Sequence, residues 1–171
     1  NRFIDELRIN GNYQGEVLVL TDYFTPTFIF PKILFDSNVK VRRFNRIKFS
    51  PKAKQSFRNL NTNNQPNRFI NKPFQWHKIN LFNARLKKGS HIFYIDINMR
   101  IHHDINTILQ NKPQNSLQAR ADGYPDFLWT LSSQFDKDSE NFITLKKRFN
   151  LEIDDYFQTG IMFFDTSIIK K

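Results

Sequence analysis

The sequence predicts an α/β protein with an open, mostly parallel sheet flanked by helices. Three short apolar runs support this prediction, at 16–22, 91–98 and 160–164. Such runs are typical of interior strands that are covered on both faces, and segments with helical spacing separate them. This alternation of helices and buried strands is the pattern of a parallel α/β sheet. A chain of 171 residues fits one domain, which we expect to span 1–171.

The first predicted element is a helix that places Phe3, Ile4 and Leu7 on one face. Turn-forming residues at 11–15 end this helix, and the strand at 16–22 follows directly. A helix followed by a buried strand is the second half of a βαβ unit. We therefore expect another strand before this sequence, so that the domain is truncated at its start.

The middle of the chain combines irregular segments with further predicted elements. A second strand is expected at 39–44, and an exposed loop at 59–67, which is rich in Asn. A helix is predicted over 74–86, because its apolar positions have helical spacing and two lysines and a glycine follow it.

The last third of the chain contains shorter predicted elements around its apolar runs. No internal repeat or low-complexity tract interrupts them. Besides the strands at 91–98 and 160–164, we expect one or two helical turns at 104–109, a loop at 111–116, and helices at 124–135 and 145–151.

The composition excludes several kinds of chemistry. The chain has no cysteine, which excludes disulfides, thiolate metal sites and cysteine nucleophiles. No apolar run approaches the roughly 18 residues that span a bilayer, and the first residues lack the apolar core of a secretory signal. We therefore expect a cytoplasmic protein. There is also no Gly-rich phosphate loop, Ser-His-Asp order or zincin helix.

The formal net charge of +10 predicts affinity for anions, such as nucleic acid, acidic membranes or a diphosphate. Much of this charge lies in what we call the basic segment. We interpret it as a solvated connection rather than a nucleic-acid surface, because no recognition helix, RNP-type or zinc-finger pattern accompanies it. The basic segment comprises Lys40, Arg42, Arg43, Arg46, Lys48, Lys52, Lys54 and Arg58.

Asp96 and Asn98 stand at the carboxyl end of the predicted strand that contains Phe93 to Ile95. Ligands collect at the carboxyl ends of strands in open parallel sheets. Two oxygen ligands at this spacing can turn toward one hard cation, such as Mn²⁺ or Mg²⁺, which stabilises a departing diphosphate. In isolation, an Asp and an Asn after a strand more often form a turn.

Three segments give this pair of residues a context. They are Trp76-x-Lys78, Phe93-Tyr-Ile-Asp-Ile-Asn-Met-Arg-Ile101 and Tyr156-Phe-Gln-Thr-Gly-Ile-Met-Phe-Phe-Asp165. In this order they resemble the basic helix, the "YLDxD" strand and the "YFNxGxM" strand of GT-A glycosyltransferases of the glycogenin and bacterial galactosyltransferase type. With the opening at 11–22, this resemblance covers nearly the whole chain. The segment at 119–125 also resembles predicted glycosyltransferases of large DNA viruses and some fungi.

The resemblance implies a GT-A, Rossmann-like fold. It also implies a hexosyltransferase-like enzyme that moves a sugar from a UDP-sugar donor to a hydroxyl acceptor and retains configuration. The acceptor would be a protein, a glycan or a lipid, and Mn²⁺ or Mg²⁺ would assist departure of the diphosphate. The histidine that supplies a third metal ligand in relatives belongs to a later motif, so we expect truncation at both ends.

Individual roles follow from the same resemblance. Asp96 and Asn98 would hold the metal, and Asn98 replaces the family's second aspartate with a neutral donor that weakens divalent-cation binding. The residues implied to bind the donor and its cofactor are Lys78, Tyr94, Asp96, Asn98, Thr159 and Gly160. Those implied at the catalytic centre are Asp122 and Gln158.

One alternative is a catalytically degenerate module of the same fold. Such a module would bind nucleotide sugar without turnover, or nucleic acid through the basic segment. The four histidines, His77, His91, His102 and His103, are interpreted as packing or surface residues. Asp154 and Asp155 are interpreted as a helix cap or a solvated turn, because adjacent side chains point in different directions.

Overall fold

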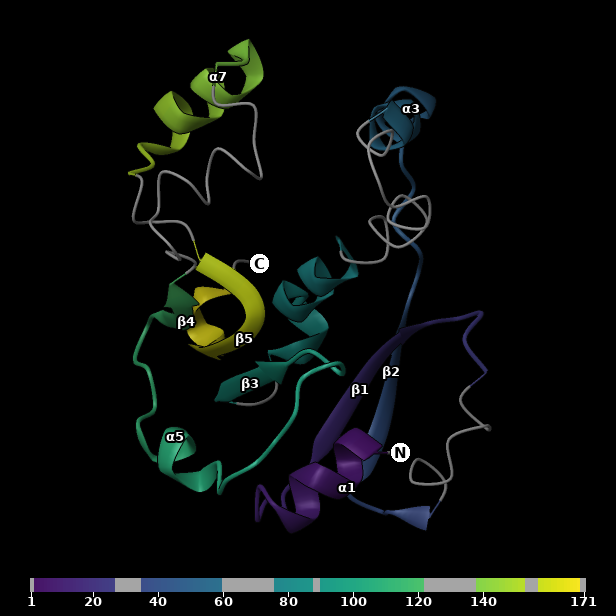
Figure 1. The fold of residues 1–171 in the computed structure, drawn as a ribbon, viewed down its shortest axis with the longest axis vertical. Coiled ribbons are helices and arrows are strands. Elements are labelled where there is room, and N and C mark those ends of the chain that lie inside the picture. Colours follow the sequence, from purple (N-terminus) through teal and green to yellow (C-terminus); the bar gives the residue numbers. More distant parts are fainter. Residues whose placement is uncertain are drawn as a thin grey trace. The chain divides into compact units, whose positions relative to one another are not determined.

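The computed structural model of this chain describes residues 2–26, 35–59, 76–87, 90–121, 138–152 and 157–169. These residues form a mixed α/β fold, as the sequence predicts, and their strands lie in two small sheets (Figure 1). The chain divides into two compact units, each with its own sheet. The first unit comprises Asn1–Lys87, Ile101–Asn106 and Ile169–Lys171, and the second comprises Lys88–Arg100 and Thr107–Ile168.

The sheet of the first unit contains the two strands predicted there. Helix α1 (Arg2–Ile9) leads into β1 (Val17–Asp22), which pairs with β2 (Val39–Phe44). The two strands are parallel and in register from Val17 opposite Val39 to Asp22 opposite Phe44. The predicted helix, both strands and the parallel pairing are therefore confirmed in this unit. Their carboxyl ends lie at the same edge of the sheet.

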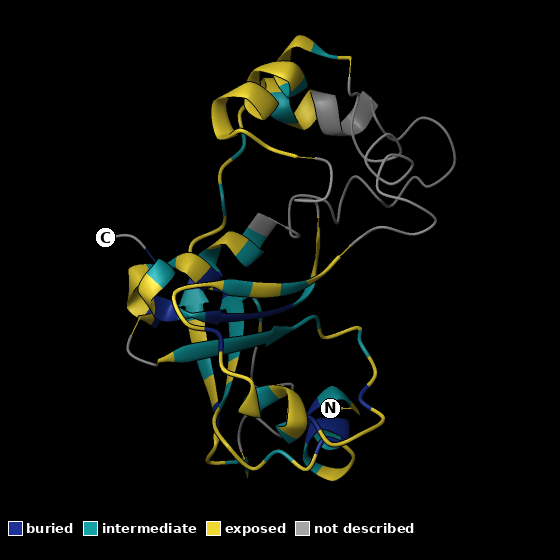
Figure 2. Ribbon diagram, turned by 90° about the vertical axis from the view of Figure 1, so that its left-hand side faces the viewer, coloured by how far each residue is buried: buried dark blue, intermediate teal, exposed yellow. Residues whose placement is uncertain are grey.

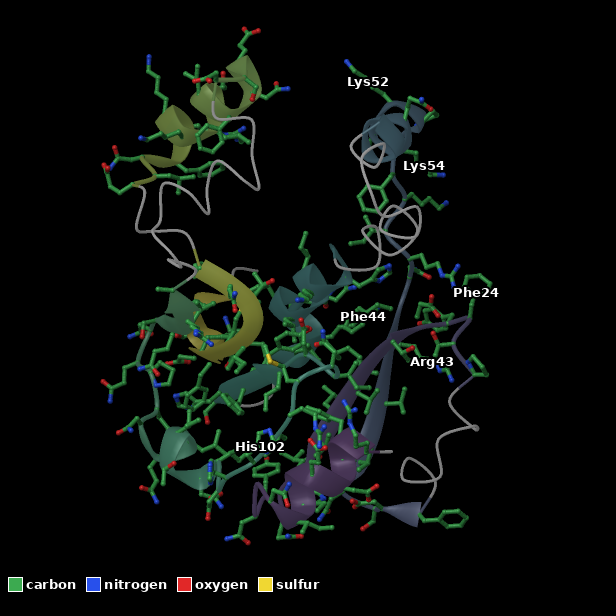
Figure 3. The ribbon with its side chains drawn as sticks, in the orientation of Figure 1. Phe24, Arg43, Phe44, Lys52, Lys54 and His102 are labelled. Carbon is green, nitrogen blue, oxygen red and sulfur yellow. The ribbon has the colours of Figure 1, made fainter. Side chains whose placement is uncertain are left out.

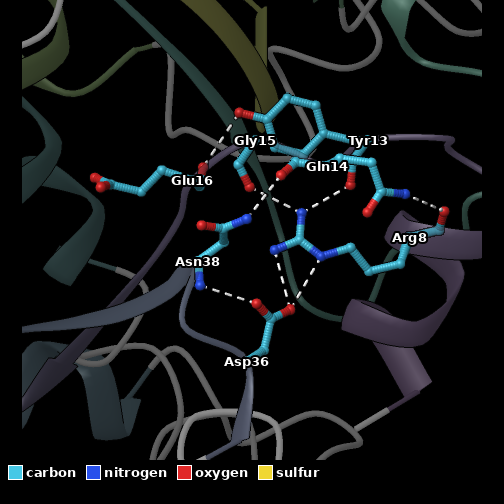
Figure 4. Close-up of polar contacts among 7 residues, drawn as sticks. All are labelled: Arg8, Tyr13, Gln14, Gly15, Glu16, Asp36 and Asn38. Atoms are coloured by element: carbon cyan, nitrogen blue, oxygen red, sulfur yellow. Dashed lines mark hydrogen bonds and ion pairs between the residues drawn. The ribbon is translucent and has the colours of Figure 1, made fainter.

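The connection between α1 and β1 is held by Arg8 (Figure 4). Its Nε donates a hydrogen bond to Oδ2 of Asp36 at 3.1 Å. Its Nη1 donates to the carbonyl oxygens of Tyr13 and Gly15 at 2.7 and 2.8 Å. One guanidinium thus joins the helix, the turn after it and the segment that enters β2, which explains why so polar a turn is ordered.

Residue Ile101 is fixed to α1 by two polar side chains. The buried carboxylate of Glu6 accepts the N–H of Ile101 at 3.0 Å, and Asn10 donates to the carbonyl oxygen of Ile101 at 2.8 Å. Gly11 continues this contact, because its carbonyl accepts the N–H of Ile105 at 3.1 Å. The burial of a glutamate in the first unit is thus compensated by a hydrogen bond and by its ion pair with Arg2.

Replacement of Gly11 by alanine is expected to lower the free energy of unfolding by about 1–3 kcal/mol. A Cβ at this position would lie 2.7 Å from the backbone oxygen of Leu7, which cannot move without distorting α1. Gly15→Ala is the matched control, since the three atoms nearest its Cβ all belong to the side chain of Tyr13, which can turn away. Urea unfolding of both variants measures the difference, and equal stabilities would contradict the steric explanation.

Two helical segments of the first unit differ from the sequence prediction. The structure has a helix α3 (Pro51–Asn59), which the sequence analysis did not predict. Ser50 caps it, accepting the N–H of Ala53 at 3.1 Å. The predicted helix over 74–86 is wrong in type, because its described part forms two 3₁₀ helices, η2 (Trp76–Phe82) and η3 (Ala84–Leu86). Asn83 separates them by accepting the N–H of Arg85 and starting a new helical turn.

The second unit contains an antiparallel sheet in the order β3–β5–β4. Its strands are β3 (His91–Ile95), β4 (Leu117–Ala121) and β5 (Phe157–Asp165). The predicted strands at 91–98 and 160–164 are confirmed, whereas their expected parallel direction is corrected to antiparallel. Strand β4 was not predicted. The sheet's core is the buried run from Met162 to Phe164, and Phe163 packs edge-on against Phe93 at a ring distance of 5.6 Å.

Short helices complete the described part of the second unit. Helix α5 (Asn106–Gln110) confirms the helical turns predicted at 104–109. Helix α7 (Glu140–Phe149) begins earlier than predicted, because Ser139 caps it, and Thr166–Ile168 forms η5. The predicted helix at 124–135 lies outside the described residues. Buried residues gather on β5 and α1, whereas α7 buries none (Figure 2). Among the described helices, none is long and apolar enough to cross a membrane.

Candidate functional site

Asp96 directly follows β3 and lies where this strand meets β5. Its N–H donates to the carbonyl oxygen of Gly160 at 2.8 Å, and its own carbonyl accepts the N–H of Met99 at 3.0 Å. The first hydrogen bond extends the pairing of β3 with β5 by one residue, and the second closes a tight turn after β3. The half-buried Asp96 is therefore fixed at both backbone groups, at the carboxyl end of β3.

The side chain of Asp96 is held by Tyr94. The two residues are two positions apart, so they project from the same face of the chain, and the Tyr94 hydroxyl donates to Oδ1 of Asp96. Burial raises the pKa of the Tyr94 phenol above its usual value, and the hydrogen bond and negative charge of Asp96 raise it further. The phenol therefore stays protonated and keeps donating into the alkaline range.

Strand β5 is irregular beside Asp96. Adjacent residues Ala119 and Arg120 of β4 pair with Met162 and Gln158, so that residues 159–161 of β5 have no pairing partner in β4. Gly160 lies in this break. A Cβ on Gly160 would lie 2.6 Å from Cε of Met99 and 3.8 Å from Oδ2 of Asp96. The missing side chain thus lets the backbone of β5 approach the end of β3, and bulges of this kind often occur near functional sites.

The structure thus brings Tyr94, Asp96 and Gly160 together. Asn98 lies in the exposed turn after β3, and Gln158 and Thr159 are exposed on β5. Lys78 is half-buried on η2, in the first unit, and Asp122 lies outside the described residues. Within the described ranges, no group of three or more His, Cys, Asp and Glu side chains could hold a metal ion.

His91 has a structural environment, as expected. Its Nε2 lies 2.8 Å from the carbonyl oxygen of Pro113, and its Nδ1 lies 3.0 Å from Oγ of Ser90. It therefore fixes the beginning of β3 to the loop before β4. His102 and His103 are exposed, which agrees with the surface role expected for them.

A second polar cluster, which the sequence analysis did not single out, lies at the carboxyl end of β1. Asp22 is buried there, with 4% of its surface exposed. Its Oδ1 accepts the N–H of Phe24 at 2.9 Å, and the N–H and hydroxyl of Thr25 at 2.7 and 2.8 Å. Its Oδ2 accepts Nε of Arg46. The sequence does show a carboxylate at the end of an apolar strand, as it does at Asp96. It does not show the partner of this carboxylate, because Arg46 is 24 residues away.

The pKa of Asp22 reflects these partners. Burial raises the pKa, but the guanidinium of Arg46 and the hydrogen bonds from Thr25 and Phe24 outweigh burial and lower it from 3.8 to about 2. The carboxylate is therefore charged at neutral pH, and its charge is matched by a cation within the same unit.

Two arginines complete the cluster, which we call the Asp22 corner and define as Asp22 to Thr25 with Arg43 and Arg46. Nη1 of Arg43 donates to the carbonyl oxygens of Asp22, Tyr23 and Thr25 at 3.1–3.3 Å. The guanidinium of Arg46 lies over the ring of Phe24, 4.9 Å from its centroid. The turn after β1 is therefore held rigidly, and Phe24 and Arg43 lie at the ends of the paired strands (Figure 3).

Comparisons with known proteins add no assignment to this geometry. A scan against models of protein families gives no match, and searches of curated proteins and of solved structures give no significant match.

Proposed function

We propose that this chain belongs to a glycosyltransferase of the GT-A kind that uses a nucleotide-sugar donor, with UDP-sugar as the first candidate. The observation that carries the proposal is the carboxylate of Asp96 at the end of β3, held by the Tyr94 hydroxyl beside the break in β5 at Gly160. The resemblance of the two strand motifs to GT-A enzymes supports the donor class.

The oxygen ligands at this position fit a hard cation that binds together with a diphosphate. The chain would supply a carboxylate oxygen from Asp96 and an amide oxygen from Asn98, and both are ligand types of Mg²⁺ and Mn²⁺. Mg²⁺ commonly takes one or two protein carboxylates and completes its shell with substrate phosphates and water. A site of this kind needs no cluster of three protein ligands. The bound cation would neutralise charge on the departing diphosphate.

The proposed reaction exchanges one bond at the anomeric carbon of the donor sugar. The bond from this carbon to the diphosphate oxygen breaks, and the nucleoside diphosphate leaves with the electron pair. The acceptor hydroxyl oxygen forms the new bond, and its proton passes to the departing diphosphate. Asp96 and Asn98 of the second unit would hold the cation. Gln158, Thr159 and Gly160 would shape the sugar pocket.

Calorimetric titration of the chain with UDP, with and without Mn²⁺, tests the proposal. We expect binding that depends on Mn²⁺, followed by slow hydrolysis of the correct UDP-sugar when no acceptor is present. Mn²⁺-dependent binding without turnover of any UDP- or GDP-sugar would instead favour the degenerate module, in which neutral Asn98 holds the cation too weakly for catalysis. No nucleotide binding in the presence of Mn²⁺ would overturn both forms of the proposal.

A further inference from the structure

Three cations of the basic segment make contacts within the first unit. Lys40 pairs with Glu16, Arg46 pairs with Asp22, and Arg43 donates to three backbone carbonyls. These three cations stabilise the first unit. Lys40 and Arg46 are themselves exposed, and so are four further cations of the segment, Arg42, Lys48, Lys52 and Lys54.

Two aromatic side chains lie exposed at the Asp22 corner. Phe24 is 74% exposed and Tyr23 is 55% exposed, although both belong to a turn that Asp22 and Arg43 hold in place. Adjacent exposed aromatic rings on a turn that is held in place offer a preformed surface on which planar groups can stack. The guanidinium of Arg46 over Phe24 adds a planar cation to this surface.

The aromatic turn follows β1 and the exposed lysines follow β2, and these two parallel strands end at the same edge of their sheet. Residues 45–50 connect the end of β2 to α3, and six residues span at most about 20 Å. Lys48 lies within this connection, and Lys52 and Lys54 extend from α3 (Figure 3). The first unit therefore presents two exposed aromatic rings at the end of β1 and three exposed lysines in the segment that follows β2.

We propose that this surface, consisting of Tyr23, Phe24, Lys48, Lys52 and Lys54, binds single-stranded nucleic acid. Unpaired bases stack on exposed aromatic rings whatever their identity, and lysines pair with the phosphates between them. This binding is separate from the proposed sugar transfer, because it uses no residue assigned to the donor.

Other anionic partners fit the surface less well. A single nucleotide offers one diphosphate, whereas the exposed lysines are distributed over the connection after β2 and α3. An acidic membrane would require an apolar helix face, yet after Pro51 the sequence of α3 has only two apolar residues, Ala53 and Phe57. An acidic polysaccharide would pair with the lysines but has no aromatic faces to stack on Phe24.

Fluorescence anisotropy with a labelled oligothymidine of about 15 nucleotides tests the proposal, with KCl varied. Three phosphate contacts predict a slope of about −2 for log affinity against log salt concentration, so a fourfold rise in salt weakens binding roughly 20-fold. The variant K48Q/K52Q/K54Q should lose this slope. Phe24→Ala should weaken binding about tenfold and leave the slope unchanged, because stacking releases no counterions.

The matched control is K146Q/K147Q/R148Q, which removes the same charge from α7 in the second unit. We expect it to bind like the unchanged chain. Equal loss in both triple variants would show that net charge alone attracts the oligonucleotide, and would overturn the proposal. Binding of Phe24→Ala that equals the unchanged chain, or a duplex that binds as tightly as the single strand, would overturn it as well.

Discussion

Asp96→Asn is expected to lower turnover of the nucleotide-sugar donor by on the order of 10²–10³-fold. The substitution keeps the size of the side chain and its place at the end of β3, where backbone bonds to Gly160 and Met99 fix it. It removes the only negative charge in the proposed cation site, since the second ligand, Asn98, is already neutral. The loss should therefore appear in Mn²⁺ affinity and in turnover, with little change in unfolding temperature.

Initial rates of donor hydrolysis at saturating Mn²⁺, together with titrations of Mn²⁺, measure this effect. Asp138→Asn removes the same charge from an exposed position before α7 and should retain full activity. Tyr94→Phe removes only the hydrogen bond to Asp96. We expect it to lower the rate of donor hydrolysis by about 10–100-fold, which lies between the effects of the other two variants. Undiminished turnover by Asp96→Asn, or an equal loss in Asp138→Asn, would contradict the assigned role.

The strands that could be predicted from the sequence are those that consist of a continuous apolar run. That pattern identified β1, β3 and β5, but it shows only that both faces are covered and carries no information on direction. The antiparallel pairing of β3 with β5 joins residues about 70 positions apart, such as Phe93 and Phe163, and no local signal specifies it. Strand β4, with the sequence Leu117-Gln-Ala-Arg-Ala121, has the alternating pattern of a half-exposed strand. Its five residues are too few for this alternation to stand out in the sequence.

The helices likewise could be predicted only where a local sequence signal marks them. Ser50 followed by Pro51 is a standard helix start, so α3 could have been predicted from its cap. Its many charged and polar residues leave too few apolar positions to show helical spacing. The 3₁₀ form of η2 and η3 was less accessible, because apolar spacing does not distinguish short 3₁₀ turns from an α-helix. Asn83, whose side chain caps η3, was the one local signal of a break.

The candidate site was predictable only in part. The strand motifs led to Tyr94, Asp96 and Gly160, and these residues do lie together. The Asp22 corner was not found, although Asp22 ends an apolar strand as Asp96 does. A terminal carboxylate becomes recognisable as a buried ion pair only when its partner is known, and Arg46 lies after the next strand. The break in β5 beside Gly160 likewise depends on β4, which the sequence did not reveal.

Asp22→Ala is expected to lower the free energy of unfolding by about 3 kcal/mol. The substitution leaves the donors of Phe24, Thr25 and Arg46 without their common acceptor, at a position with 4% exposure. Asp22→Asn keeps an acceptor oxygen for the turn and loses only the charge, so about 1 kcal/mol is expected, because half-exposed Arg46 can be solvated. Glu16→Gln, which breaks the exposed pair with Lys40, is the matched control and should cost less than about 1 kcal/mol.

The stabilisation from the Asp22 charge should also depend on pH. The pKa of Asp22 is about 2 in the folded chain, and its ordinary value is 3.8. The unfolded chain therefore takes up this proton first as the pH falls, so the contribution is complete above about pH 5 and disappears as the pH falls toward 2. Urea unfolding of the unchanged chain and of Asp22→Asn at several pH values isolates this group, since all other carboxylates are common to both. The stability difference should shrink between pH 5 and 2, and a difference that stays constant would show that the charge on Asp22 does not stabilise the fold.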